Sequence, residues 1–165
     1  MLSHKARTLL SLAAVLAVAG MIFFFSSQNG EESSTLSGSI SRFVLSVLVP
    51  DYESLTPEEQ APYLEAWGYA IRKIAHFSEY ALLAVSLVNF LHTANSRWRL
   101  AWVVLLAWVI ATVYAGGDEW HQTFVSARVG AYTDVMIDSA GTLTGALLMA
   151  LILWIHLRKR RSHKP

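Results

Sequence analysis

The sequence contains no cysteine, few charged residues and long stretches with no charge at all. Without cysteine, the 165-residue chain can form no disulfide bond, thiolate metal site or cysteine nucleophile. Charged residues make up 15% of the chain, whereas a soluble domain carries about 25%. Hydrophobic residues make up 54%, which predicts a membrane protein rather than a soluble domain.

Four segments are apolar enough to cross a bilayer as helices. They are residues 9–25, 74–91, 100–116 and 135–155, each about 17 residues or longer. The first could instead be a cleaved signal peptide, because residues 17–19 form an Ala-x-Ala sequence. Cleavage there would leave the apolar run 21–25 at a new N-terminus, so we favour a retained membrane anchor.

Acidic residues are absent from three segments that are rich in lysine and arginine. These are the N-terminus with Lys5 and Arg7, the connection with Arg97 and Arg99, and the tail 156–165. Because positively charged connections stay in the cytoplasm, this distribution predicts four spans with both termini cytoplasmic. The basic tail is interpreted as an orientation signal that contacts anionic lipid, and nucleic acid is not an expected partner.

The first external connection is long and contains its own helical patterns. Apolar residues recur at helical spacing over about residues 36–49, with a serine-rich opposite face. This amphipathic helix is predicted either to lie flat on the outer membrane surface or to pack over the bundle. Residues 56–59 form a capping box with proline at the first helical position, and Pro62 is expected to limit that turn. The predicted fold is therefore an all-α membrane protein forming a single domain over 1–165: a four-transmembrane-helix bundle with an extra amphipathic interfacial helix in the first external loop.

The outer end of the second span carries the first group of candidate functional residues. Arg72, His76 and Glu79 share one stripe of a helix, and Lys73 and Tyr80 flank it. Ionisable groups within a membrane are candidates for function, so His76 and Glu79 are candidate catalytic residues. The alternative is structural, with Glu79 neutralised by Arg72 or His76 to hold the bundle together.

A second group follows the third span. Gly116 and Gly117 allow either a close approach or a break in the helix. If the helix continues, Asp118 and His121 are neighbours on one face. They could form a base with its orienting carboxylate, two ligands of one metal, or a helix-end hydrogen bond with no further role. Glu119 and Gln122 beside them are candidate binding residues.

A third group opens the fourth span. Arg128 lies in a polar connection, and Asp134 and Asp138 lie four residues apart on one helix face. Gly141 and Gly145 extend that face with a spacing that lets another helix pack closely, either the second span or a second copy of the chain.

These residues together resemble the VanZ-like family. The motif runs Arg72-Lys73-x-x-His76-Phe77-x-Glu79-Tyr80, then Asp118-Glu119-x-His121-Gln122-x-Phe124-x-x-x-Arg128-x-Gly130-x-x-x-Asp134. Phe25-Ser26-Ser27-Gln28 and the Gly141/Gly145 pair are similar to the family pattern too. Asp138, where the family pattern predicts asparagine, and the long external loop depart from it. The resemblance implies a multi-pass protein of the bacterial cytoplasmic membrane with a role in the cell envelope, in a family named for a member linked to teicoplanin (glycopeptide) resistance. It implies no particular reaction.

Three hypotheses for the function follow. The first is binding of a lipid-linked or lipophilic envelope molecule, or of a lipoglycopeptide, in an outward-facing polar pocket, where Arg72, Lys73 and Arg128 meet an anionic group. The second is an intramembrane hydrolase or transferase acting on such a lipid. Neither a G-x-S-x-G nor an H-E-x-x-H motif supports it, although His76, Glu79, Asp118 and His121 could hold a metal. The third is a small proton-coupled transporter component, which would need to oligomerise. Whether the chain is an enzyme, and which cofactor it would use, is left open by the sequence.

Overall fold

The structure is a computed structural model that describes residues 2–28, 30–126 and 130–162. The described chain is helical throughout and contains no strand. Its elements in chain order are α1 (His4–Ser26), α2 (Gly30–Leu48), the short 3-10 helix η1 (Tyr52–Ser54), α3 (Pro57–Ala94), α4 (Leu100–Gln122) and α5 (Tyr132–Ser162).

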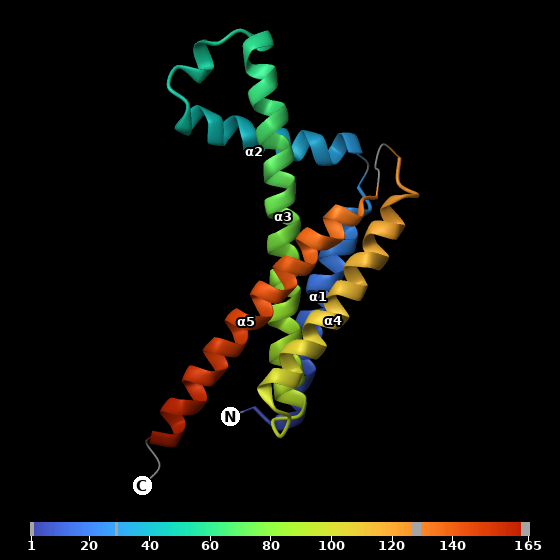
Figure 1. Ribbon diagram of the computed structural model, residues 1–165, viewed down its shortest axis with the longest axis vertical. Coiled ribbons are helices and arrows are strands. Elements are labelled where there is room, and N and C mark those ends of the chain that lie inside the picture. Colours follow the sequence, from blue (N-terminus) through green and yellow to red (C-terminus); the bar gives the residue numbers. More distant parts are fainter. Residues whose placement is uncertain (1, 29, 127–129, 163–165) are drawn as a thin grey trace.

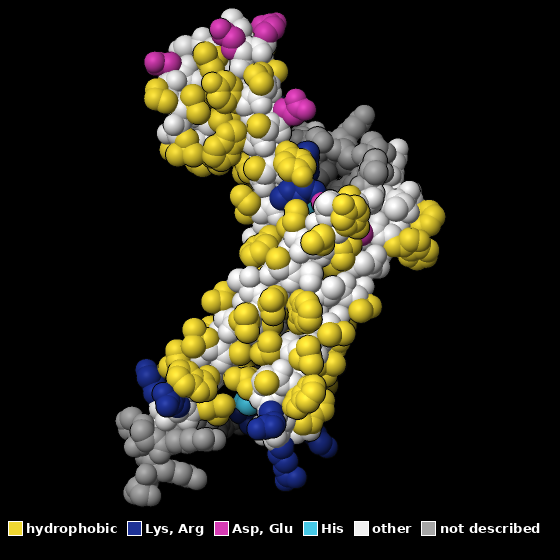
Figure 2. Space-filling view, viewed as in Figure 1, with side chains coloured by type: hydrophobic (Ala, Val, Ile, Leu, Met, Phe, Trp, Pro, Cys, Tyr) yellow, Lys and Arg dark blue, Asp and Glu magenta, His cyan; other side chains and the backbone are white. Residues whose placement is uncertain are grey.

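Helices α1, α3, α4 and α5 are each long and apolar enough to cross a membrane. This confirms the four predicted spans, and each helix extends beyond the apolar segment that predicted it. Both termini lie at the same end of the bundle, as an even number of crossings requires (Figure 1). Acidic side chains gather at the opposite tip of the molecule, and basic side chains gather near the termini (Figure 2).

Helix α3 is much longer than a membrane is thick. Its 38 residues span about 57 Å, whereas a hydrocarbon core is about 30 Å thick. The N-terminal turns of α3 therefore project beyond the bundle (Figure 1). The helix begins at the predicted capping box, in which the Thr56 side chain accepts from the Glu59 backbone amide and the Glu59 carboxylate accepts from the Thr56 amide. Pro62 does not limit this turn as expected, because α3 continues through it and loses only one intrahelical hydrogen bond.

The core of the bundle lies between α3, α4 and α5, with α1 packed against α3. Small side chains let α4 approach its neighbours closely, since Ala107, Ala111 and Ala115 are all fully buried. On α5, a Cβ atom at Gly141 would lie 2.3 Å from the Phe77 carbonyl oxygen, and one at Gly145 would lie 2.1 Å from that of Ala81. The glycine pair thus packs α5 directly on the backbone of α3, which confirms the predicted close contact with the second span.

Helix α2 crosses α3 above the bundle, and it does so with its serine face (Figure 1). Ser37, Ser41 and Leu45 are buried, and the hydroxyls of both serines lie within 4 Å of the position that a Cβ at Gly68 would take. The apolar face is left exposed, with Phe43 at 72% of its surface accessible. The helix also begins at Gly30, earlier than predicted, and the apolar face does not pack over the bundle.

Helix α2 meets α3 at Gly68, which lies about one membrane thickness from the C-terminal part of α3. From Leu91 to Gly68, α3 rises about 34 Å, close to the thickness of the hydrocarbon core. An apolar helix face at this height is where an interfacial helix would meet lipid. The exposed apolar residues are Ile40, Phe43, Val47 and Leu48. In Figure 2, hydrophobic side chains gather on the side of the projecting part, formed by α2 and the start of α3, that is nearest the bundle.

Candidate functional site

A small cavity lies where the end of α1, α2 and the middle of α3 meet. Its volume is about 120 Å³, and it is lined by Phe25, Ser26, Gln28, Ser37, Ile40, Ile71, Arg72, Ala75, His76 and Glu79. Three of the predicted site residues, Arg72, His76 and Glu79, therefore share one cavity wall, because their spacing places them on one face of α3. The Arg72 guanidinium donates to the Ser37 hydroxyl at 3.1 Å, which joins α2 to this wall.

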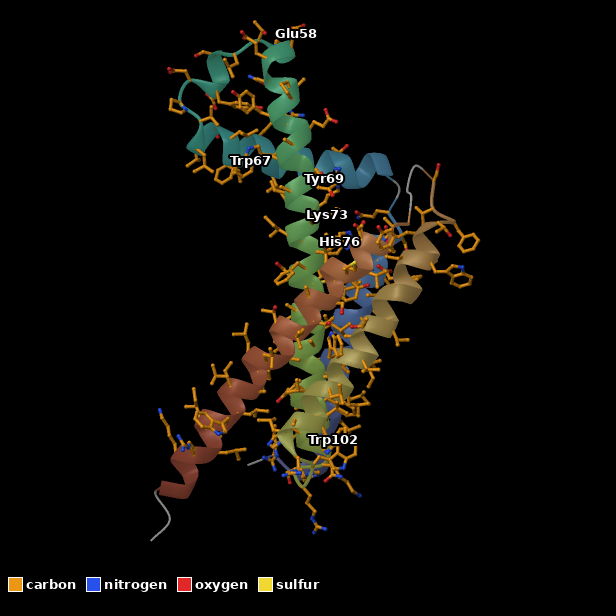
Figure 3. All side chains as sticks on the ribbon, viewed as in Figure 1. Glu58, Trp67, Tyr69, Lys73, His76 and Trp102 are labelled. Atoms are coloured by element: carbon orange, nitrogen blue, oxygen red, sulfur yellow. The ribbon has the colours of Figure 1, made fainter. Side chains whose placement is uncertain are left out.

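Lys73 points to a different partner from its neighbour Arg72. Its ammonium group forms an ion pair with Asp134 in the first turn of α5, and it lies 5.0 Å from the centre of the Tyr69 ring. Figure 3 shows Lys73 and His76 one above the other on α3, beside the outer end of α5. Lys73 thus pairs with a carboxylate of the protein, and its role in binding an anionic ligand stays a prediction.

The end of α4 brings two carboxylates into the interior. Asp118 and Glu119 are each only 5% exposed. Glu119 accepts a hydrogen bond from the Ala131 backbone amide at 3.0 Å, and a Cβ at Gly130 would lie 2.5 Å from the Glu119 carbonyl oxygen. Glycine at 130 therefore lets the end of the connection between α4 and α5 lie directly against α4.

The structure does not pair Asp118 with His121. Helix α4 runs without a break through Gly116 and Gly117, and a Cβ at either glycine would meet nothing within 4 Å. Asp118 accepts a hydrogen bond from the Gln122 amide at 3.3 Å instead. The His121 ring packs against the Phe23 ring of α1, with centroids 5.0 Å apart.

Asp138 is fully buried between the helices. It is 0% exposed, and among the described residues neither of its carboxylate oxygens has a hydrogen-bond partner. The Oδ1 atom of Asp138 lies 4.0 Å from the Nδ1 atom of His76. Tyr80, also fully buried, completes the surroundings of Asp138 and Asp118.

The two carboxylates of α4 and the two of α5 thus gather near the stripe on α3. Asp138 is within electrostatic range of Glu79, Asp118, Glu119 and Asp134. Burying so many acids in a membrane protein is costly unless they are paired or hydrogen-bonded. The arrangement concentrates carboxyl groups on the inner side of the α3 stripe, whereas Arg72 lies on the side of the cavity.

A set of hydroxyl groups lies next to this cluster and was not predicted from the sequence. Thr112 of α4 hydrogen-bonds Ser139 and Thr142 of α5, and the Trp108 indole donates to Ser139. The signal was present, since these are polar residues within apolar spans. Nearer the termini the core becomes apolar, with Leu87, Val88 and Val103 at its centre.

The candidate metal ligands do not converge within the part of the chain that the structure describes. No three histidine, aspartate, glutamate or cysteine side chains lie close enough there to share a metal ion. Arg128, a predicted anion-binding residue, lies outside the described residues. The structure thus assembles Arg72, His76 and Glu79 at one cavity, and it places Lys73, Asp134, Asp138, Asp118 and Glu119 behind it.

Comparison with known proteins found a match to a family model. No curated protein and no solved structure matches this chain. The family model described as VanZ/LLP1 matches residues 11–154, which includes every candidate residue discussed above. The match covers most of the 165-residue sequence from the first span to the fourth, and the chain belongs to the VanZ/LLP1 family.

Proposed function

We propose that this protein binds the anionic headgroup of a lipid-like or lipid-linked envelope molecule at the outer surface of the bacterial cytoplasmic membrane. The observation that carries the proposal is the cavity of about 120 Å³, which is lined by Arg72, His76 and Glu79 and lies beside the exposed apolar face of α2. In the proposed orientation both termini are cytoplasmic and the cavity faces outward.

Arg72 is the group that favours an anion. In the described part of the chain Arg72 forms no ion pair, and it donates a hydrogen bond to the neutral hydroxyl of Ser37. A guanidinium carries five donor hydrogens in a planar array, so hydrogen bonding to Ser37 leaves donors for a phosphate or carboxylate. Lys73 supports this role indirectly, because its pairing with Asp134 removes one negative charge from the vicinity.

The size of the cavity favours a headgroup over a whole ligand. Pockets that enclose a drug-sized molecule have volumes of about 300–1,000 Å³. A cavity of about 120 Å³ corresponds to roughly four water molecules, so it can enclose one anionic group and little more. A lipoglycopeptide is far larger, and we therefore favour a lipid whose remaining parts lie outside the cavity.

The surroundings of the cavity supply a place for those remaining parts. Ile40 of α2 lines the cavity, and the same helix face continues through Phe43 and Val47, both exposed. If this face lies in the outer leaflet, an acyl or polyprenyl chain can remain in the membrane while its headgroup enters from the side.

The test is native mass spectrometry of the protein after gentle extraction in a neutral detergent, comparing wild type with Arg72→Gln. We expect wild type to retain an anionic lipid, and we expect Arg72→Gln to retain about tenfold less of it, because a charge-assisted hydrogen bond contributes about 1.5–3 kcal/mol. Arg42→Gln is the matched control, since Arg42 is an exposed arginine of α2 that lines a different pocket. Equal retention by all three proteins would overturn the proposal.

A second candidate function, hydrolysis or group transfer on the same lipid, is favoured by one contact. His76 lines the cavity and lies 4.0 Å from the buried carboxylate of Asp138. A carboxylate behind an imidazole is the arrangement of a general base, although this distance exceeds that of a hydrogen bond and would have to shorten when substrate binds. Glu79, on the same wall, would be the candidate acid.

The variant His76→Gln distinguishes the two candidate functions. If the protein is an enzyme, a polyprenyl pyrophosphate supplied in detergent micelles would release phosphate with wild type, and His76→Gln would lose this turnover while still retaining the lipid. If wild type binds the lipid but releases no phosphate, the enzyme candidate is excluded for this substrate and the binding function remains.

A further inference from the structure

A second concave surface lies at the opposite end of the bundle from the cavity described above. It is a groove of about 560 Å³ on one side of α4 and of the connection that precedes it. Its lining residues are Arg97, Trp98, Arg99, Trp102, Leu105, Leu106 and Val109. We refer to this surface as the α4 groove, and Trp102 marks its position near the termini in Figure 3.

The wall of the α4 groove is a continuous apolar stripe. Positions 98, 102, 105, 106 and 109 recur at helical spacing, so their side chains lie along one face. All five are exposed, from Leu106 at 37% to Trp102 at 62% of their surface. Such a stripe in contact with water would be unfavourable, but in a membrane it faces acyl chains.

The length of the stripe corresponds to one leaflet. From Arg99 to Val109, α4 rises about 15 Å, which is half of a hydrocarbon core of about 30 Å. The groove thus runs from the membrane surface to about the middle of the bilayer, which is the depth reached by the acyl chain of a single phospholipid.

The mouth of the groove is positively charged. Arg97 and Arg99 are both exposed, and in the described part of the chain neither forms an ion pair with a carboxylate. The connection 95–99 contains no acidic residue. The turn is held by hydrogen bonds from the Arg97 and Trp98 backbone amides to Asn95, so both arginines are positioned at the start of the apolar stripe.

We propose that the α4 groove binds one anionic phospholipid from the leaflet at the end of the bundle that carries the termini. The two guanidinium groups meet the phosphate, and Trp98 and Trp102 flank the junction of headgroup and acyl chain, where indole rings are favoured. The acyl chain lies along Leu105, Leu106 and Val109. This site is independent of the function proposed above, because it lies on other helix residues at the other membrane surface.

The experiment uses quenching of tryptophan fluorescence by brominated lipids in vesicles that contain the full-length protein. Vesicles of phosphatidylcholine receive a small fraction of either dibromo-phosphatidylglycerol or dibromo-phosphatidylcholine. Each basic residue near a membrane surface favours anionic lipid about fivefold. With two arginines at the site, we expect quenching by phosphatidylglycerol at roughly 25-fold lower mole fraction than by phosphatidylcholine.

Three variants assign the effect. Arg97→Gln combined with Arg99→Gln should abolish the preference, whereas Lys5→Gln combined with Arg7→Gln removes the same charge at the same end of the bundle and should keep it. Trp102→Phe keeps both arginines, so it should lose most of the lipid-specific quenching while native mass spectrometry still detects retained phosphatidylglycerol. This variant keeps the proposal testable if the double arginine variant fails to fold.

Equal quenching by the two brominated lipids in wild type would overturn the proposal. So would an unchanged preference in a folded Arg97/Arg99 double variant. Inorganic phosphate added at millimolar concentration should not reduce the quenching, because the acyl chain supplies most of the contact area. Displacement by phosphate alone would show a site for a free anion and would also contradict a phospholipid site.

Discussion

At the scale of single residues, glycine decides how closely the helices approach each other. The chain has glycines at two kinds of helical position. Gly141 and Gly145 are buried where α5 meets the backbone of α3, whereas Gly116 and Gly117 of α4 have open space around the position of a Cβ. The same residue type is therefore required for packing at one pair and is conformationally unfavourable at the other.

This difference predicts opposite effects of alanine on stability. Gly141→Ala and Gly145→Ala should each lower the free energy of unfolding by about 1–3 kcal/mol, because a methyl group would overlap a backbone carbonyl that cannot rotate away. Gly116→Ala and Gly117→Ala should raise it by about 0.5–1 kcal/mol, since alanine favours the helix. Thermal unfolding in detergent measures both, and a similar change at all four positions would contradict the packing described here.

At the scale of elements, α2 presents an unusual division of its surface. Its serine-rich face packs on α3 near Gly68, and its apolar face is exposed. The serine-rich face can be buried because its hydroxyl groups find partners within the helix. The hydroxyl of the buried Ser41 donates a hydrogen bond to the Ser37 carbonyl oxygen at 2.7 Å. A polar face that bonds to its own backbone can be buried without a large penalty, which leaves the apolar face for lipid.

The membrane contact of α2 is testable with single cysteines, which the absence of native cysteine makes simple. Val47 and Arg42 are both exposed, and they lie about 140° apart around the helix. A nitroxide at Val47→Cys should collide more with oxygen dissolved in lipid, and one at Arg42→Cys more with a water-soluble nickel chelate. Equal accessibility of both labels to the nickel chelate would place α2 in water, away from the membrane.

At the scale of the whole molecule, two ends with different charge define the orientation. The tip of α3 is acidic, and the end that carries both termini is basic (Figure 2). Because the positive-inside rule assigns the basic end to the cytoplasm, we propose that the cavity at Arg72 faces outward and that the α4 groove faces inward.

The orientation predicts the side from which introduced cysteines react. Ser96 lies in the basic connection between α3 and α4, and Ser126 lies beyond the end of α4, so α4 separates them. A membrane-impermeant maleimide added to intact cells should label Ser126→Cys and not Ser96→Cys, and permeabilisation should expose the latter. Labelling of both cysteines from one side would refute the topology. It would also mean that the candidate site residues do not lie at one membrane surface.

The helices and most of the candidate residues followed from the sequence alone. Span positions depend on local hydropathy, and the beginning of α3 depends on a capping box, so both are determined by short segments of the sequence. The stripe of Arg72, His76 and Glu79 follows from the 3.6-residue period of a helix and needs no tertiary information. The contact of Gly141 and Gly145 with α3 was predicted by a spacing that favours close packing.

What each polar side chain bonds to was decided only by the tertiary structure. Lys73 pairs with Asp134, and Glu119 accepts a hydrogen bond from the Ala131 amide. These partners depend on how far each helix is rotated and how deeply it sits, to within a few ångströms, and periodicity does not carry that information. The serine face of α2 turned toward α3 for the same reason, since a helical pattern shows which residues share a face but not which neighbour covers it.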